Sequence, residues 1–452
     1  MSSCKQRLYK ERLVSLKKNR CLKGAFCFLI QVGELIFNPS IKGKKMKKLM
    51  VIAVFLVFFT GSAYAAAEWN FYGSARISTF YSNIDDNPFQ AGSPHTSSYE
   101  QDLNGNARIG AKVKVSDTLT GQFEYGAKKG AANIRLLWGE WNFGAGSLGV
   151  GQHYTPLLMP YSNQVYNIYA RKDGDTNMAM FGMLYGKRKA MIRLKFGTFQ
   201  IAAVQTKTTV ANYATLSPAS GIPVGALPTV PPTPYYLAAG QPDTEVKLPS
   251  IQAKYKYDFD AGHLNFAGGY QTFDVLNGGQ SYDVSSYVLA LGGRLNAGGF
   301  YFKGNVWGGQ NVGNMADIIT TGSIVSSAAG ITGDLDGSGL GFAQWSDGTI
   351  NTATGGLAGI TKGIIDNDAL AALLVVGYEI RKGLYLEAGY GYTQTELDMA
   401  GSQTEKCQTM YLQSTVFLAP GVFLTPEIGL SDFNELDQPR IYYGGIKWQI
   451  NF

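Results

Sequence analysis

The sequence predicts an all-β protein, a transmembrane antiparallel β-barrel of about 16 strands, an even number as such barrels require. Three observations carry this prediction. The chain ends on a strand with one apolar and one polar face. The rest of the chain after residue 65 is a series of short alternating segments. The connections between these segments are short on one side and mostly long on the other.

The closing segment Ile441–Phe452 alternates with a period of two. A period of two predicts a strand whose successive side chains point to opposite faces. A terminal aromatic residue on the apolar face is typical of a lipid-facing closing strand with its aromatic girdle. The polar face, which includes Lys447, is expected to line the barrel interior. The apolar face carries Phe452, Ile450, Trp448 and Tyr442.

Earlier segments show the same alternation. In Trp69–Phe80, aromatic and aliphatic residues alternate with polar ones, and Ala107–Val115 sets aliphatic residues against basic ones. Ile251–Tyr257 and His263–Tyr270 follow the same pattern. The chain contains 56 glycines, and each glycine inside a helix costs roughly 1 kcal/mol, so a helical bundle is disfavoured.

The connections decide between a soluble sheet protein and a membrane barrel. Long loops on one side and tight turns on the other are typical of outer-membrane barrels, with the turns facing the periplasm. Closure is required because an open sheet edge cannot lie in hydrocarbon. A soluble β-solenoid or a multi-sandwich protein is the alternative. Long connections are expected at about 81–102, 154–178, 206–247 and 311–367, and short turns near Ser116, Gly144, Gly186–Lys189, Asp258–Gly262, Asn296–Gly299, Arg381–Gly383 and Ala419–Gly421.

The amino-terminal region predicts secretion. Two lysines after Met46 precede the apolar run Leu49–Phe59 and a small-x-small exit ending at Ala65. This is the anatomy of a secretory signal peptide over residues 46–65, and the run is short for a transmembrane helix of about 20 residues. Cleavage is expected after Ala65, with Ala67 as the alternative. We expect translation to start at Met46, which would make residues 1–45 an upstream extension and residues 66–452 one barrel domain.

Charge and cysteine content exclude several classes of function. The chain has 39 Lys and Arg against 33 Asp and Glu, but residues 1–65 hold 13 of the basic and two of the acidic residues. The remainder is therefore acidic, and nucleic acid is not an expected partner. After residue 65 the one cysteine is Cys407, and the chain has three histidines. No metal site or cofactor is expected from so few ligands.

One segment carries a more specific resemblance. Ile134–Phe143 is a strand that bears Arg135, and a glycine turn, the Gly-rich strand Gly146–Gly151 and Gln152–Pro156 follow it. This pattern resembles the general porins of Gram-negative outer membranes, which are trimeric 16-stranded barrels. The resemblance implies passive diffusion of ions and small hydrophilic solutes. It also implies a homotrimer, contact with outer-membrane lipid and lipopolysaccharide, and recognition of Phe452 by the barrel-assembly machinery.

The resemblance further implies that the third external loop, about residues 154–178, folds inward and narrows the pore. Loop acids would face a row of wall arginines, and the opposed charges would sort small solutes. The porin Pro-Glu-Phe-Gly-Gly loop motif is absent, so ion preference stays open. The same residues could also be solvated wall residues or turn caps. The candidates are Arg171, Asp173 and Asp175 in the loop and Arg76, Arg108 and Arg135 on the wall.

Two other functions remain open. A substrate-selective channel of the same fold would use a row of lumen aromatics, for which Tyr72, Tyr301 and Trp307 are candidates. An outer-membrane barrel hydrolase would need a histidine beside a serine or a carboxylate. His95 has Ser93, Ser97, Ser98 and Glu100 near it in the sequence. We expect a channel and not an enzyme.

Overall fold

The chain divides into two units, Met1–Ala66 and Ala67–Phe452. A computed structural model describes residues 67–85, 95–128, 131–166, 175–212, 243–318, 340–346, 362–399, 402, 404–432 and 440–452. The expected upstream extension, the signal peptide and its cleavage site at Ala65 lie outside these residues. Two loop candidates, Arg171 and Asp173, lie outside them as well.

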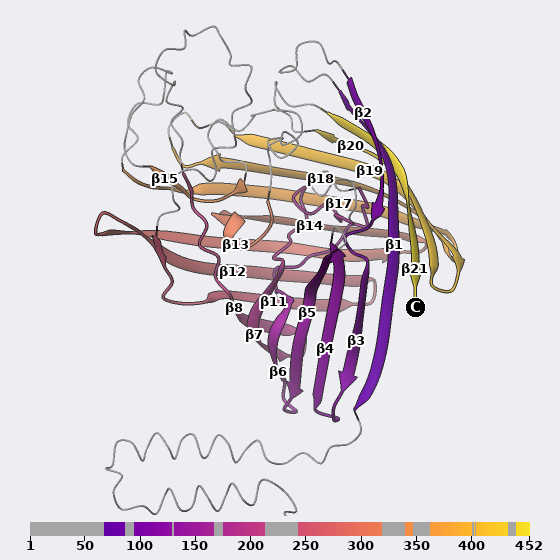
Figure 1. Ribbon diagram of the computed structural model, residues 1–452, viewed down its shortest axis with the longest axis horizontal. Helices are drawn as coiled ribbons and strands as arrows, with labels where there is room; N and C mark the ends of the chain where they lie inside the picture. The colour runs from indigo at the N-terminus through magenta and orange to yellow at the C-terminus, as the bar shows by residue number, and fades with distance from the viewer. Residues whose placement is uncertain are drawn as a thin grey trace, which may run out of the picture. The chain divides into compact units, whose positions relative to one another are not determined.

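The second unit is a closed antiparallel barrel of 16 strands, as predicted (Figure 1). Neighbours in sequence are neighbours in the barrel, and every pair of wall strands is antiparallel. The wall strands are β1 (Glu68–Asp85), β3 (Arg108–Lys114), β4 (Leu119–Lys128), β5 (Ala131–Asn142), β6 (Ser147–Tyr154), β7 (Arg188–Phe196), β8 (Phe199–Val204), β11 (Ser250–Phe259), β12 (Gly262–Asn277), β13 (Gln280–Ala297), β14 (Phe300–Gln310), β17 (Asn367–Arg381), β18 (Leu384–Leu397), β19 (Glu405–Ala419), β20 (Val422–Asp432) and β21 (Ile441–Asn451).

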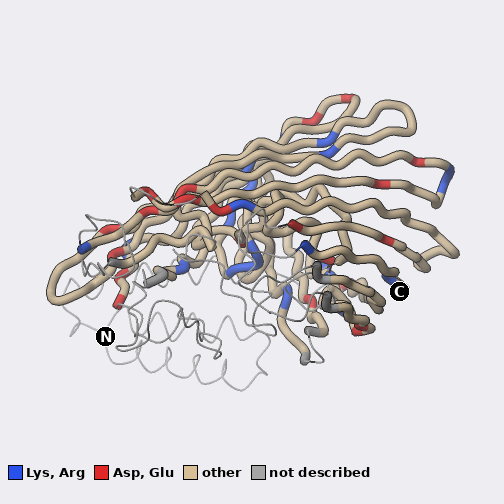
Figure 2. Tube along the Cα trace, turned by 90° about the horizontal axis from the view of Figure 1, so that it is seen from above, with Lys and Arg blue, Asp and Glu red and all other residues tan. Residues whose placement is uncertain are grey.

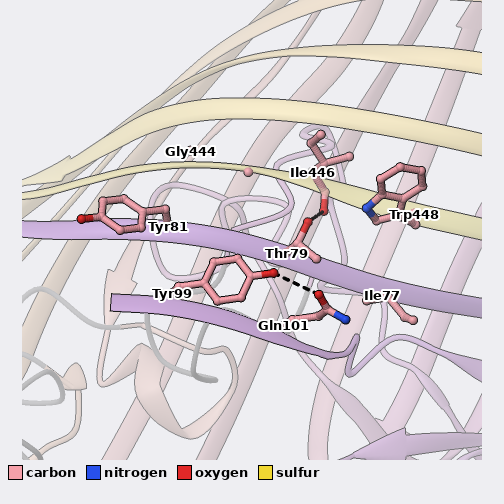
Figure 3. Close-up of a pocket in the computed structure, with 9 residues that line it drawn as sticks. Ile77, Thr79, Tyr81, Tyr99, Gln101, Gly444, Ile446 and Trp448 are labelled. Atoms are coloured by element: carbon pink, nitrogen blue, oxygen red, sulfur yellow. Dashed lines mark hydrogen bonds between the residues drawn. The ribbon is translucent and has the colours of Figure 1, made fainter. Parts of the chain in front are cut away.

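The barrel closes between its first and last strands. β21 pairs with β1 from Ser74 opposite Asn451 onward, and the Thr79 hydroxyl donates to the Ile446 carbonyl at 3.0 Å across this seam (Figure 3). Phe452 continues the ladder, because its N–H and C=O both bond to Gly73. A Cβ at Gly73 would lie 2.3 Å from the Phe452 ring, so this ring packs directly over the Gly73 backbone.

The alternation predicted for the closing segment is confirmed. The apolar set points outward, and Phe452 is 72% exposed to the barrel exterior. Tyr443 and Lys447, on the polar set, are instead covered by groups inside the barrel. The other outward residues of the closing strand are Ile450, Trp448 and Tyr442.

The second barrel strand is interrupted. Its upper part, β2 (His95–Leu103), pairs with the upper half of β1, and its lower part, β3, pairs with the lower half. Between them the buried Asn104 donates its side-chain amide to the Ser78 hydroxyl at 2.9 Å. Its side-chain oxygen accepts the N–H of Asn106 at 2.8 Å. This break turns Asn106 out of the ladder and toward the interior.

The predicted turns are confirmed with one exception. Gly186–Lys189 is not a periplasmic turn but the return of the third external loop into β7. The Gly186 backbone N–H donates to the Leu157 carbonyl. Lys187 has a positive φ of 64°. The tight turn of this hairpin is instead at residues 197–198, where Gly197 has a φ of 59°.

Two of the long loops contribute small elements. Residues 205–249 hold β9 (Ala211–Asn212) and β10 (Asp243–Glu245), and residues 311–366 hold the 3-10 turn η2 (Val312–Asn314), β15 (Gln344–Ser346) and β16 (Gly363–Ile365). β15 pairs with β9 and β16 in a separate small sheet. Trp345 packs there in a cluster with Phe273 and Val284 of the wall. The two loops therefore meet each other and the barrel wall.

Candidate pore constriction

The third external loop, Thr155–Lys187 (L3), packs inside the barrel, as the resemblance implied. The main hydrophobic cluster combines L3 side chains with inward residues of β12–β14, β17, β19 and β21. Trp307 of β14 is 2% exposed and donates its indole N–H to the Gly182 carbonyl at 2.9 Å. The wall residues beneath L3 are small or apolar, and they include Ala267, Val288, Ala290, Ala369, Ala371, Leu373 and Val375.

A buried carboxylate on β18 anchors the first half of L3. Glu387 accepts the Asn163 backbone N–H at 3.1 Å and its side-chain amide at 2.8 Å. The same carboxylate accepts Tyr301 and Tyr411 hydroxyls at 2.9 and 2.6 Å. Lys303 balances its charge at 2.8 Å. These bonds leave Glu387 3% exposed and fully engaged in holding the loop.

A second wall carboxylate holds the adjacent residues. Glu427 of β20 accepts the backbone N–H groups of Val165 and Tyr166 at 2.7 and 2.9 Å. Gln164, between them, donates its side-chain amide to the Tyr443 hydroxyl at 2.9 Å. Tyr166 stacks on the Tyr443 ring with 3.9 Å between centroids. L3 is therefore bound to the wall through its backbone as well as its side chains.

Of the loop acids predicted for the constriction, Asp175 lies in the described part of the chain and contacts the wall. Its carboxylate is 2.5 Å from the Arg76 guanidinium and 2.8 Å from the Lys447 ammonium. Its backbone carbonyl accepts the Asn106 side-chain amide at 3.0 Å. Burial alone would raise the pKa of Asp175, and the Lys447 and Arg76 cations hold that pKa below its ordinary value. The Asp175 carboxylate therefore attaches L3 to β1 and β21 through two ion pairs.

The other two wall arginines share a different acid. Arg135 donates to Glu124 of β4 at 2.5 Å, and Arg108 lies 3.5 Å from the same carboxylate. Tyr72 donates its hydroxyl to Glu124 at 3.0 Å. Arg135 also donates to the Asn106 side-chain oxygen at 3.0 Å, which links this pair to the Asp175 group. The interruption of the second strand therefore joins both charge clusters through one asparagine.

The structure brings the three predicted arginines to one side of the barrel. They do not face loop acids across an open gap, because Arg76 pairs directly with Asp175 and Arg135 with Glu124. Direct pairing arises because L3 reaches the wall on this side through residue 175. Sequence reasoning missed Glu124, although its inward position follows from the alternation of β4. The aromatics Tyr301 and Trp307 anchor L3 and do not form a row along the lumen.

The sixth external loop, residues 311–366 (L6), also enters the barrel. Val312, Met315 and Ile318 belong to the same hydrophobic cluster as L3. Ile318 forms an isolated β-bridge with Met180 of L3. Lys187 of L3 forms an ion pair with Asp317 of L6. Two loops, not one, therefore narrow the interior.

The inner face of β3, β5, β7 and β11 carries more basic than acidic residues, and Figure 2 marks the positions of Lys, Arg, Asp and Glu along the chain. Strand registers place these cations on the same inward face as Arg76. The carboxylates on this part of the wall are fewer, and Glu140 pairs with Arg193 at 3.3 Å. The inward basic residues of β3, β5, β7 and β11 are Arg108, Lys112, Lys114, Arg135, Lys189, Arg193, Lys195, Lys254 and Lys256.

Within the described ranges, no group of three or more histidines, cysteines or acids is placed to hold a metal ion. The described residues contain no helix that is both long and apolar enough to span a membrane. Cys407 is buried beneath L3.

No protein-family model and no curated protein matches the sequence. Among solved structures, the outer membrane channel DcaP of Acinetobacter baumannii aligns with a TM-score of 0.56 and 14% identity, over 87% of this chain and 99% of that chain. The chain has the β-barrel fold of this outer membrane channel.

Two further solved structures have lower TM-scores. A loop-deletion mutant of OmpT, an outer membrane protein of Vibrio cholerae, has a TM-score of 0.48 and 14% identity over 85% of this chain and 100% of that chain. Salmonella typhi OmpF has a TM-score of 0.48 and 13% identity over 84% of this chain and 97% of that chain.

Proposed function

We propose that this chain is a porin that lets small hydrophilic solutes diffuse across the outer membrane of a Gram-negative bacterium, with a preference for anions. The observation that supports it is the unequal inner wall. Apolar inward residues are covered by L3 and L6, so solutes pass along the basic side. A passage lined by one sign of charge concentrates ions of the opposite sign.

The pairing of the wall charges supports the choice of sign. Glu387 and Glu427 are buried against L3 and face no open space. Lys112 and Lys195 form no ion pair with any carboxylate among the described residues, whereas Lys189 and Lys254 donate to backbone carbonyls of L6 and L3. The cations available to a solute therefore outnumber the available acids, although the chain after residue 65 is acidic in total.

Planar-bilayer recording of purified, unboiled protein tests the proposal. Under a potassium chloride gradient, the reversal potential should have the sign of chloride preference. A reversal potential of the opposite sign would contradict the anion preference, and the proposal that the protein is a channel would still stand. Absence of conductance in protein that shows the heat-dependent gel mobility of a folded barrel would overturn the channel itself.

We propose a homotrimer as the working form. A groove of about 620 Å³ lies on the outer face of β2, β1 and β21, and Gly444 and Gly445 are among the residues that line it. Figure 3 shows Gly444 there beside Tyr81 and Thr79. Thr79 and Gln101 place polar groups on this otherwise apolar face. Protein covers such groups better than lipid does. Closure of the recorded current in three equal steps is the expected signature, and single-step closure throughout would contradict it.

The remaining outer face suits lipid and lipopolysaccharide, because its exposed residues are largely aliphatic and aromatic. Phe452 and the outward residues of β21 would serve as the signal that the barrel-assembly machinery reads. Deleting Phe452 should reduce the amount of barrel in the outer membrane while secretion across the inner membrane continues. Unchanged insertion would contradict this role.

A further inference from the structure

Three lysines approach one turn of L6, two of them from the junction of L3 and β7 and one from the fourth external loop. Lys189 of β7 donates its ammonium to the Asn314 carbonyl at 3.0 Å. Lys187, at the end of L3, forms an ion pair with Asp317, three residues further along L6. Lys207 follows β8, in the fourth external loop (residues 205–249, L4). The turn at Asn314 therefore lies where L3, L4 and L6 meet.

Side-chain bonds fix the position of Lys207 relative to this turn. Thr209 donates its backbone N–H to the Asn314 side-chain oxygen at 3.0 Å, and the Asn314 amide donates back to the Thr209 carbonyl at 3.0 Å. Gln271 of β12 donates to the Lys207 carbonyl at 2.9 Å. Both ends of the short segment that carries Lys207 are thus attached to neighbouring elements.

The charges at this junction are unbalanced. Asp317 is the one carboxylate that pairs with any of the three lysines among the described residues. The Lys207 ammonium lies 4.1 Å from the centre of the Phe342 ring and donates to no described oxygen. Three positive charges against one negative charge leave an excess of two at a half-buried site.

The electrostatics of Lys207 agree with this geometry. Burial, and then the nearby Lys187 and Lys189 cations, lower the pKa of Lys207 to about 8, and Asp317 opposes the shift only in part. A cation whose charged form is disfavoured gains from an anion placed beside it. The ring face of Phe342 supplies a weaker contact than a carboxylate would.

We propose that Lys187, Lys189 and Lys207 form a binding subsite for a small oxyanion with two negative charges, taken as a free ion or as a phosphate ester. This subsite rests on the proposed anion-preferring channel and names a class of solute that would pause at the junction of L3, L4 and L6. Two excess positive charges match a dianion, and ammonium groups are good donors to its oxygens.

Titration of the chloride current through the full-length, purified channel tests the subsite. Sulfate, inorganic phosphate and glycerol phosphate are added separately, with glycerol as the neutral comparison. The three anions should reduce the current with saturation, whereas glycerol should not. If glycerol phosphate acts and the two inorganic ions do not, the subsite is wrong as stated, because the ester would be recognised through its glycerol part.

Lys207→Gln and Lys189→Gln should each raise the half-saturating sulfate concentration about tenfold, since each removes one nearby charge. Lys207→Arg keeps the charge and should stay within about threefold of the natural chain. Lys382→Gln is the matched control, because Lys382 is exposed on the periplasmic turn between β17 and β18. Heat-dependent gel mobility shows that each variant has folded.

The outcomes separate the subsite from the proposed function. If both glutamine variants bind sulfate like the natural chain while chloride preference persists, the subsite is wrong and the channel proposal stands. If the natural chain prefers cations, the proposed function fails first. If one glutamine variant does not fold, the other still decides, because the two lysines lie on different segments.

Discussion

The two sides of the inner wall are built differently although they belong to one barrel. Beneath L3, the strands β12–β14 and β17 present small and aliphatic side chains inward, together with the buried acid Glu387 on β18. On the other side, β3, β5, β7 and β11 present lysines and arginines. The first side binds a loop and excludes water. The second side stays polar and, on our proposal, carries the solute.

The difference shows how a barrel can hold a constriction in place. An apolar inward residue would be wetted in an open pore, so it is stable only where a loop covers it. L3 supplies that cover, and wall carboxylates accept its backbone N–H groups. A charged inward residue needs no such cover. Each side should therefore respond to a different kind of substitution.

The largest expected effect is on the apolar side. Glu387→Ala removes the acceptor for Asn163 and leaves Lys303 buried without its partner. Breaking a buried ion pair in this way costs about 3–5 kcal/mol. We expect a lower unfolding temperature and a noisier, larger single-channel conductance as L3 detaches. Glu379→Ala, at an exposed acid of the adjacent strand, is the control. A quiet channel of natural conductance would show that Glu387 does not hold the loop.

A smaller effect is expected where L3 touches the wall most closely. A Cβ at Gly391 would lie 1.9 Å from the Phe181 carbonyl, whereas one at Gly139 on the outer face would meet nothing within 4 Å. Overpacking of this kind costs about 1–3 kcal/mol. Gly391→Ala should therefore lower the unfolding temperature and Gly139→Ala should not, as measured by gel mobility after stepwise heating. Equal behaviour of the two variants would argue against close packing of L3.

On the basic side, the expected effect is on selectivity and not on stability. Arg108 lies 3.5 Å from Glu124, but Arg135 satisfies that acid at shorter range. Arg108→Gln removes one wall charge, worth about 1 kcal/mol at 4 Å in water. The chloride preference should fall by up to about fivefold at an unchanged unfolding temperature. Lys382→Gln should leave the reversal potential unchanged. A rise in chloride preference for Arg108→Gln would reverse the assignment of the two sides.

Much of this architecture could be predicted from the sequence, because alternation fixes which face a residue occupies. The outward set of the closing strand and the inward positions of Arg76 and Arg108 follow from it directly. Arg135 points inward because the register between β4 and β5 shifts at this residue, whereas strict alternation from the inward Trp138 would turn it outward. The family resemblance predicted that Asp175 lies in the third loop near the constriction. It did not predict the direct ion pair with Arg76, because 99 residues separate the two in the chain.

The difference between the two sides could not be predicted as easily. In β17, the run Ala369–Val376 is apolar at every position, so alternation is lost. Such a run indicates a strand that is covered on both faces. It could therefore have identified β17 as a strand on which L3 packs. The turn predicted at Gly186–Lys189 was wrong because glycine and lysines also suit a loop that re-enters the wall. Local composition does not separate the two cases.

The smallest expected effect concerns the pH dependence of the basic side. The pKa of Lys207, at about 8, lies below the ordinary value for lysine. The positive charge is therefore present at pH 7 and mostly lost at pH 9. Sulfate keeps its two negative charges over this range, so the change can be assigned to the protein. The half-saturating sulfate concentration should rise several-fold from pH 7 to pH 9.

The groups that face Lys207 set the control for this experiment. Lys187 and Lys189 oppose its charge and Asp317 supports it. Lys207→Arg stays charged throughout the range, so its sulfate affinity should change less between pH 7 and pH 9 than that of the natural chain. The same change in both proteins would place the titrating group elsewhere on the basic side.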